Sequence, residues 1–235
     1  MTAVGSAPNT RRADDVFFPL VAVLMLACVI VGFARSYFLA GMLSAHLPSL
    51  LVHIHALFFV GWALVATAQP LLVAIGKTQW HTRLGLTAFV FAVALPVLGL
   101  LTLYGAVRSH NLPPQFEDLI STLDVVFLID FVALVVLGLR ARGADSSSHK
   151  RLMYVATVSL LAPAITRFPF DFSLPELFGI QYAFVVALLV FDLAVLHKPH
   201  RATLLGGAII LMSHAIGFGL LTTTLPHELV TALRR

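Results

Sequence analysis

Long apolar runs alternate with short polar breaks along the whole chain. An apolar run of about 20 residues is long enough to cross the hydrocarbon core of a bilayer as a helix. Turn-forming residues such as Pro48, Gly76, Pro113 and Gly143 lie in the breaks. The pattern predicts an all-α, polytopic integral membrane protein, a bundle of seven transmembrane helices at roughly residues 16–35, 50–75, 83–107, 119–141, 151–169, 177–197 and 202–223.

The order of these runs predicts a first helix followed by three hairpins, formed by helices 2–3, 4–5 and 6–7. The second helix of each hairpin opens with similar residues. These openings are His81 to Gly85 (HTRLG), His149 to Met153 (HKRLM) and, more loosely, His200 to Leu204 (HRATL). Residues 1–15 are expected to form a disordered cytoplasmic N-terminus, residues 16–225 the transmembrane domain, and residues 226–235 a short C-terminal tail.

Lysine and arginine are divided unequally between the two ends of the predicted bundle. With the N-terminus inside, ten of them fall on the inner side and five on the outer side. Cytoplasmic loops carry an excess of these residues, so the N-terminus is expected inside and the C-terminus outside. The inner ten are Arg11, Arg12, Lys77, Arg83, Arg140, Arg142, Lys150, Arg151, Lys198 and Arg201.

The composition agrees with a membrane protein. The chain is 59% hydrophobic and 11% charged, with a mean hydropathy of +0.96, whereas soluble domains carry roughly a quarter charged residues. The net charge of +4 does not indicate nucleic acid, because the basic residues lie in loops between apolar runs. Cys28 is the single cysteine, which excludes an intramolecular disulfide and a CxxC motif. Arg11-Arg12 precede two acids and a long run, so a retained first span is expected rather than a cleaved signal.

A series of polar motifs resembles that of a family of uncharacterised bacterial multi-spanning membrane proteins. The series is His53-x-His55, Trp62, Gln69, His81-x-Arg-Leu-Gly, His149-Lys-Arg-Leu, Arg167-x-Pro169 and His200-Arg-Ala-Thr-Leu. The resemblance covers about residues 36 to 210 and leaves His214 outside. It implies a shared architecture and a bacterial inner membrane, but no biochemical function.

The second predicted helix carries a polar stripe. His55, Trp62 and Gln69 are spaced by seven residues, so they share one face of the helix. Lipid offers these groups no hydrogen-bond partner, and the stripe is therefore expected to face the bundle. His53, two residues from His55, points to another face. On the seventh predicted helix, His214 lies seven residues from a Gly206-Gly207 pair that allows a close approach of a neighbouring helix.

Ionisable residues inside the spans are expected to face partners or a water-filled cavity. With about 1.5 Å of rise per residue, His55, Asp124 and Arg167 fall at a similar depth in the outer half. Asp124 and Arg167 are thus predicted to form an ion pair. Asp130 falls near the midplane and Asp192 closer to the inner side.

Two imidazoles on facing helices suggest one function, that of a b-type haem protein. His55 and His214 form the best pair of axial ligands, with His53 in reserve. A metal-dependent intramembrane hydrolase is a second interpretation, since Ser213-His214 faintly resembles the adiponectin-receptor and ceramidase superfamily. That pattern expects a further histidine where this chain has Phe218, so the three-histidine zinc site is incomplete unless Asp124 substitutes.

The interpretation favoured by the sequence is non-catalytic: a subunit, an assembly factor or a small-molecule-binding protein whose polar cluster lies in the outer half. Its partners are the lipid bilayer and other membrane subunits. At the inner rim, a set of basic residues is expected to bind lipid phosphates or a ligand. Transport through Asp130 and Asp192 is a further alternative. The chain contains no GxSxG, P-loop, dinucleotide fingerprint or HExxH motif. The inner-rim set is His81, Arg83, His149, Arg151, His200 and Arg201.

Overall fold

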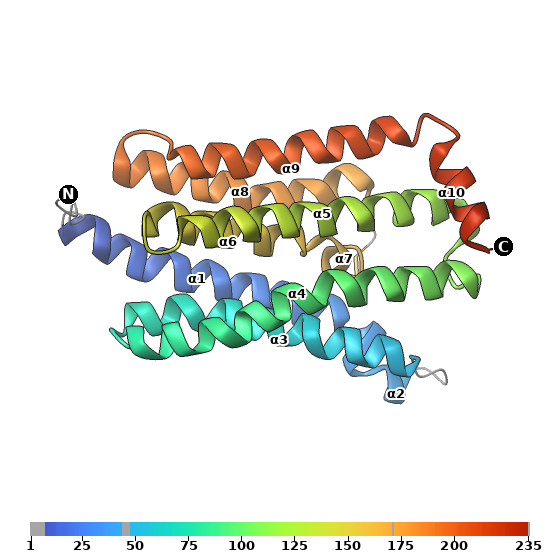
Figure 1. Ribbon diagram of the computed structural model, residues 1–235, viewed down its shortest axis with the longest axis horizontal. Coiled ribbons are helices and arrows are strands. Elements are labelled where there is room, and N and C mark those ends of the chain that lie inside the picture. Colours follow the sequence, from blue (N-terminus) through green and yellow to red (C-terminus); the bar gives the residue numbers. More distant parts are fainter. Residues whose placement is uncertain (1–7, 44–47, 171, 235) are drawn as a thin grey trace.

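The computed structural model describes residues 8–43, 48–170 and 172–234, and within these ranges the protein consists of helices and loops without strands (Figure 1). The all-α prediction is confirmed. The elements are α1 (Pro8–Phe33), a π-helical turn η1 (Ala34–Phe38), α2 (Ala40–Leu43), α3 (Leu50–Ala74), α4 (Thr78–Arg108), a 3-10 turn η2 (Pro114–Phe116), α5 (Glu117–Ala141), α6 (Ser146–Ser159), α7 (Ala162–Ile165), α8 (Leu174–Leu196), α9 (Arg201–Leu220) and α10 (Leu225–Arg234).

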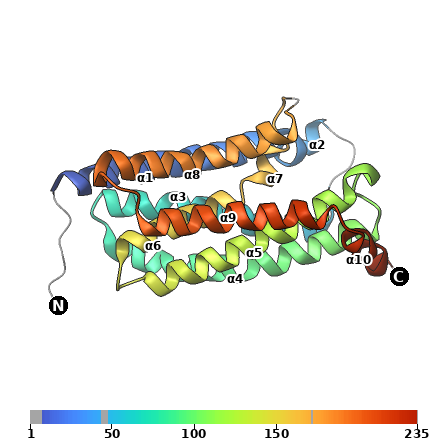
Figure 2. The same ribbon diagram turned by 90° about the horizontal axis from the view of Figure 1, so that it is seen from above.

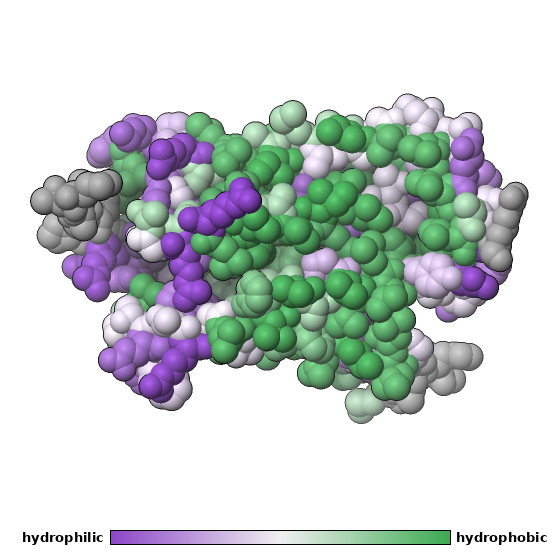
Figure 3. Space-filling view, viewed as in Figure 1, coloured by the Kyte–Doolittle hydropathy of each residue, from purple (hydrophilic) through white to green (hydrophobic). Residues whose placement is uncertain are grey.

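The long helices run up and down along one axis in both ribbon views (Figures 1 and 2). The N-terminus shares one end of the bundle with the α3–α4, α5–α6 and α8–α9 connections; we call this the N-side end. The C-terminus and the α4–α5 connection lie at the opposite, C-side end. Hydrophobic residues cover the middle of the visible face and hydrophilic residues gather at its two ends (Figure 3). This distribution suits a bundle that spans a bilayer, with its middle in the hydrocarbon.

Six helices in the described ranges are long and apolar enough to cross a membrane: α1 with η1, α3, α4, η2 with α5, α8 and α9. The fifth predicted helix, residues 151–169, differs from the prediction. It starts earlier, at Ser146, and α6 ends at Ser159 after 14 residues. Pro163 explains the end, because proline has no N–H to donate to the Ser159 carbonyl and its ring would clash with that carbonyl.

The side chain of Gln181 on α8 compensates for the broken helix. Its Nε2 donates to the Val158 carbonyl at 3.1 Å and faces the Ser159 carbonyl at 3.5 Å. The Val158 carbonyl also accepts from the Leu161 N–H at 3.0 Å, so the amide is a second donor there and lies close to the Ser159 carbonyl, for which lipid supplies no partner. Beyond the break, α7 packs against α1 and α8.

Helix α6 lies in the centre of the bundle, although it is the least hydrophobic of the long helices. It contacts α5, α9, α8, α1 and α3, and eight of its residues are buried, including Arg151 and Ser159. Gly206 of α9 permits a close approach, since a Cβ there would lie 3.2 Å from the side chain of Val155. The helix-to-helix contact expected at this glycine is therefore with α6.

Both terminal segments are more ordered than the sequence suggests. Helix α1 begins at Pro8, so residues 8–15 are helical rather than disordered, and Asp14 forms an ion pair with Lys150 of α6. Residues 1–7 lie outside the described ranges. The expected C-terminal tail forms α10, which packs on α4 and α5. Arg234 anchors it through an ion pair with Glu117.

The arrangement of the ends predicts which positions share a side of the membrane. In a Cys28→Ala background, cysteines at Ala144 and Lys198 should react with an impermeant maleimide from one side, and a cysteine at Asn111 from the other. All three positions are exposed. Labelling of right-side-out and inverted vesicles measures the sidedness. Opposite labelling of positions 144 and 198 would show that α6 and α7 do not complete a crossing between them.

The contact between α1 and α7 predicts a strong effect of adding one methyl group. A Cβ at Gly32 would overlap the backbone carbonyl of Ala164, so Gly32→Ala must push α7 away. We expect it to lower the free energy of unfolding by about 1–3 kcal/mol. Gly219→Ala is the control, because nothing lies within 4 Å of its added Cβ. Thermal unfolding in detergent compares the two variants, and equal midpoints would exclude the close contact.

Candidate ligand cavities

Two cavities lie one after the other along the axis of the bundle. The N-side cavity has a volume of about 490 Å3 and lies between α1, α3, α4, α5 and α6. The C-side cavity has a volume of about 880 Å3 and lies between η1, α3, α4, α5, the α6–α7 break and α8. Leu161 lines the first cavity and its neighbour Leu160 lines the second. The broken helix therefore stands between the two cavities.

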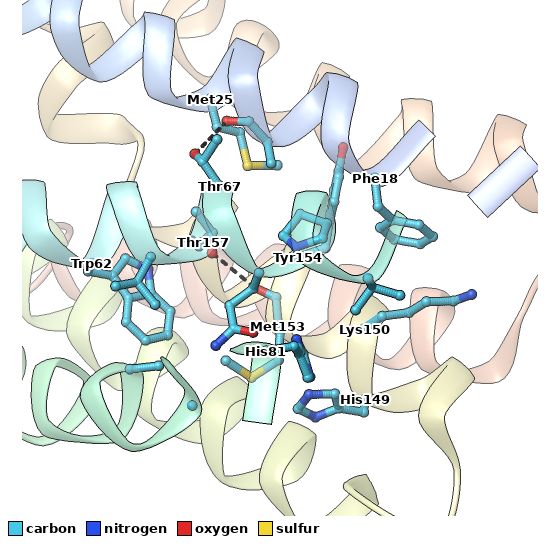
Figure 4. A pocket seen from close by; sticks show the side chains of 18 of the residues that line it. Phe18, Met25, Trp62, Thr67, His81, His149, Lys150, Met153, Tyr154 and Thr157 are labelled. Atoms are coloured by element: carbon cyan, nitrogen blue, oxygen red, sulfur yellow. Dashed lines mark hydrogen bonds between the residues drawn. The ribbon is translucent and has the colours of Figure 1, made fainter. Parts of the chain in front are cut away.

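Basic side chains gather at the mouth of the N-side cavity. Figure 4 shows His81, His149 and Lys150 on one side of the view, away from Trp62. His149 is held by a 2.8 Å hydrogen bond between its Nδ1 and the Gly138 carbonyl. The charged and imidazole residues that line the cavity are five bases, Arg11, His81, Arg142, His149 and Lys150, and two acids, Asp14 and Asp15.

The deep part of the N-side cavity is apolar. Met25, Trp62 and Ala92 line it and are buried, whereas Phe18 lies at the mouth, where its ring centroid is 5.1 Å from Nζ of Lys150. Trp62 is 3% exposed and packs edge-on against Phe131, with ring centroids 4.9 Å apart. Its indole N–H donates to no group among the described residues. The cavity thus combines a basic mouth with an apolar interior.

The polar stripe of α3 lies along both cavities. His55 lines the C-side cavity, whereas Trp62 and Gln69 line the N-side cavity. The Gln69 amide lies against α4, with its nitrogen facing Nδ1 of His81 and its oxygen facing the Gly85 N–H at 3.2 Å. His53 is exposed, and its Nδ1 pairs with the Tyr37 hydroxyl at 2.9 Å. The two neighbouring histidines therefore have separate environments.

The C-side cavity brings together three of the residues expected at the outer half. His55, Asp124 and Arg167 all line it, and Gln181 joins them. The predicted ion pair is not formed, since no nitrogen of Arg167 lies within 4.0 Å of an Asp124 oxygen among the salt bridges of the described residues. The break explains this, because Arg167 follows the end of α7. Its guanidinium donates to the Pro163 carbonyl and lies 5.1 Å from the ring centroid of Phe33.

His214 belongs to a different buried cluster. It is 1% exposed, its Nδ1 pairs with the Tyr182 hydroxyl at 2.8 Å, and its Nε2 lies 3.6 Å from Oδ2 of Asp130. Asp130 accepts a 2.7 Å hydrogen bond from Ser213. Tyr182, His214, Asp130 and Ser213 therefore join α8, α9 and α5.

This geometry lends the cofactor interpretations no support. Both ring nitrogens of His214 face protein groups, and His214 does not line the cavity that contains His55. Axial haem ligation by the two residues would require both rings to open onto one space. Within the described ranges, no group of three or more His, Cys, Asp or Glu side chains is placed to hold a metal ion.

A fully buried ion pair that was not predicted from the sequence lies near the N-side end. Arg151 is 1% exposed and Asp192 0% exposed. Nε and Nη2 of Arg151 donate to Oδ1 of Asp192 at 2.9 and 2.5 Å. The second carboxylate oxygen accepts from the Thr203 hydroxyl and from the His200 N–H at 3.2 Å. Arg151 is thus a structural residue rather than a lipid-binding rim residue. Counted from the observed helix ends, Arg151 is five residues into α6 and Asp192 is four residues before the end of α8, so the two charges lie together. A fifth helix that begins at residue 151 separates them by about 8 Å in depth.

The rim residues outside the cavity either are exposed at the surface or cap a helix. Arg83 is exposed and stacks on Trp80, and Arg201 is exposed and pairs with Asp145 at 3.0 Å. Hydrogen bonds from the Ser148 hydroxyl and N–H hold the pKa of Asp145 well below its ordinary value, so it stays ionised as the N-cap of α6. Burial, and then the charge of Arg151, lower the pKa of His200. Neutral His200 can accept from the Ala202 N–H at 3.1 Å and cap α9.

Comparison with known proteins identifies no relative. No family model, no curated protein and no solved structure matches the chain. Function therefore has to be inferred from the chemistry of the cavities.

The buried ion pair predicts a large difference between two arginines at the same end. Arg151→Met leaves Asp192 without its counter-charge inside the bundle, which should lower the free energy of unfolding by about 3–5 kcal/mol. Arg201→Met removes a side chain that is 84% exposed and should cost less than about 1 kcal/mol. Unfolding in mixed micelles measures both.

A double variant separates loss of charge balance from loss of packing. Arg151→Met combined with Asp192→Asn should cost less than the sum of the two single variants, because no uncompensated charge remains. Additive losses would show that the two residues do not act as a pair.

Proposed function

We propose that the chain is a non-catalytic, multi-pass protein of a bacterial inner membrane that binds a small amphiphile with an anionic head group. The observation that carries the proposal is the N-side cavity, with a basic mouth and an apolar interior. In this proposal α6 and α7 together form a seventh crossing, and the N-terminus is cytoplasmic. The mouth of the N-side cavity then opens at the inner surface of the membrane.

The mouth offers donors for an anionic head group. Five basic side chains outnumber two acids there, and one of the acids, Asp14, is already paired with Lys150. Arg142 lies over α4, where its Nη2 is 3.4 Å from the position of a Cβ on Gly85. Together with His81 and His149, this guanidinium can bind a carboxylate or phosphate by charge-assisted hydrogen bonds.

The interior suits the apolar part of the same ligand. A volume of about 490 Å3 lies in the range of small-molecule cavities, which are mostly apolar and hold a few polar groups. Burial of an alkyl chain against Phe18, Met25 and Trp62 contributes about 0.8 kcal/mol per methylene. An amphiphile thus gains from both ends of the cavity, while a purely polar solute gains from the mouth alone.

The two threonine hydroxyls in this cavity favour binding over catalysis. Thr67 donates to the backbone carbonyls of Ala63 and Ala22 at 2.8 and 3.2 Å, and Thr157 donates to that of Met153 at 3.0 Å. A hydroxyl nucleophile needs a neighbouring base that takes its proton, and these hydroxyls donate to carbonyls instead. Their role is to donate hydrogen bonds to backbone carbonyls of the helices that form the cavity.

Tryptophan fluorescence tests the proposal. In a Trp80→Phe variant, emission comes from Trp62, which lies deep in the cavity. Dibromostearate should quench it saturably, and oleate or dodecyl phosphate should reverse the quenching. Oleyl alcohol should compete at least about tenfold more weakly, because charge-assisted hydrogen bonds are worth about 1.5–3 kcal/mol and tenfold corresponds to 1.4 kcal/mol. The relative strength of oleate and dodecyl phosphate distinguishes a carboxylate from a phosphate ligand.

Two variants provide the controls. Arg142→Ala combined with His81→Ala should weaken dibromostearate binding about tenfold, while Arg83→Ala, on the same helix as His81 but outside the cavity, should not. Equal quenching in the reciprocal Trp62→Phe variant, which retains the exposed Trp80, would indicate partitioning into detergent. Equal competition by oleyl alcohol would rule out an anionic head group.

A further inference from the structure

The wall of the C-side cavity contains buried hydrogen-bonding atoms that none of the described residues satisfies. Gln181 is 0% exposed, and while its Nε2 donates to α6, its Oε1 accepts from no donor among the described residues. Nδ1 of His55 is also buried and has no partner among them. Both residues line the cavity. A buried polar atom without a partner costs about 1–3 kcal/mol, so both atoms lower the stability of the bundle.

A carboxylate lies in the same cavity. Asp124 accepts no hydrogen bond from the described residues, and none of their basic groups lies within 4.0 Å of it. Arg167 lines the cavity as well, but it donates to the Pro163 carbonyl and stacks on Phe33. A carboxylate within a membrane span is expensive unless it meets an opposite charge. The missing partner of Asp124 is therefore a cation.

Asp124 lies nearer the C-side end than Gln181 does. It is seven residues into α5, about 10 Å below the start of that helix at 1.5 Å per residue. Gln181 is next to Tyr182, which pairs with His214, and His214 faces Asp130, six residues further along α5 than Asp124. A cation in the outer part of the cavity therefore meets the Asp124 carboxylate.

The walls of the cavity suit an apolar stem attached to such a cation. Phe33, Phe59, Phe127 and Phe178 line it. Aromatic faces attract cations by about 0.5–2 kcal/mol and also bury apolar surface. The volume of about 880 Å3 leaves room for a drug-sized molecule.

We propose that the C-side cavity is a binding site for an amphipathic organic cation, a protonated primary amine on an apolar stem. The ammonium donates to the Asp124 carboxylate, which lines the cavity. The stem packs against the aromatic walls. This site differs from the N-side cavity in position and in the sign of the charge that it selects, so it does not depend on the function proposed above.

Competition among three matched probes tests the charge preference in the unaltered protein. Radiolabelled phenylbutylamine is bound to the full chain in detergent and measured by scintillation proximity. Unlabelled phenylbutylamine should displace it at least about tenfold better than the neutral phenylbutanol, and phenylbutyrate should displace it least. No saturable binding of phenylbutylamine, or stronger binding of phenylbutyrate, would overturn the proposal.

Variants locate the bound amine. Asp124→Asn should weaken phenylbutylamine binding at least about tenfold, whereas Asp130→Asn, on the same helix but bonded to Ser213, should leave it unchanged. Arg167→Gln should preserve or strengthen binding, because it removes a like charge from the cavity. Ala56→Phe, which adds a ring to the cavity wall, should block binding without altering any charge. Unchanged affinity in both Asp124→Asn and Ala56→Phe would exclude this cavity as the site.

Discussion

Pro163 imposes the constraint on which the arrangement of the bundle depends. It ends α6 half-way through the apolar interior, because it has no N–H to donate to the Ser159 carbonyl. The Val158 carbonyl accepts from the Leu161 N–H at 3.0 Å and also from Nε2 of Gln181, which faces the Ser159 carbonyl at 3.5 Å. Carbonyls inside a bilayer depend on such protein donors, so this amide links α8 to the end of α6. The same break directs Leu160 and Leu161 towards different cavities.

The charged part of α6 imposes a second requirement. Arg151 belongs to a helix with five neighbouring helices. Its charge is tolerated there because Nε and Nη2 donate to Asp192 and Nη1 donates to Ser147. Asp192 in turn holds the turn between α8 and α9 through Thr203 and His200. A buried ion pair adds little net stability, but it fixes register, since a shifted helix would leave a charge unpaired. The N-side end is therefore locked by polar contacts, and the middle by apolar packing.

The sequence allowed the helical class and most span positions to be predicted, because length and hydropathy depend only on local composition. The break of the fifth helix depends on Pro163. This proline is visible in the sequence, but the apolar residues around it make the segment look like one continuous span. The pairing of Arg151 with Asp192 could not be found by comparing depths, because the predicted fifth helix begins at Arg151, five residues after the observed start of α6. The absence of contact between Asp124 and Arg167 could not be predicted either, because the chain after Pro163 leaves the helical path on which depth was counted.

The polar groups inside the bundle fall into two kinds, and the difference separates structure from function. Arg151, Asp192 and Asp130 all have protein hydrogen-bond partners, as expected for groups retained to hold helices together. Asp124 and Oε1 of Gln181 have none among the described residues, and both line a large cavity. Packing alone would favour an apolar side chain at position 124, since an unpaired carboxylate destabilises the fold. The carboxylate is therefore better explained by a molecule that enters the cavity than by the bundle itself.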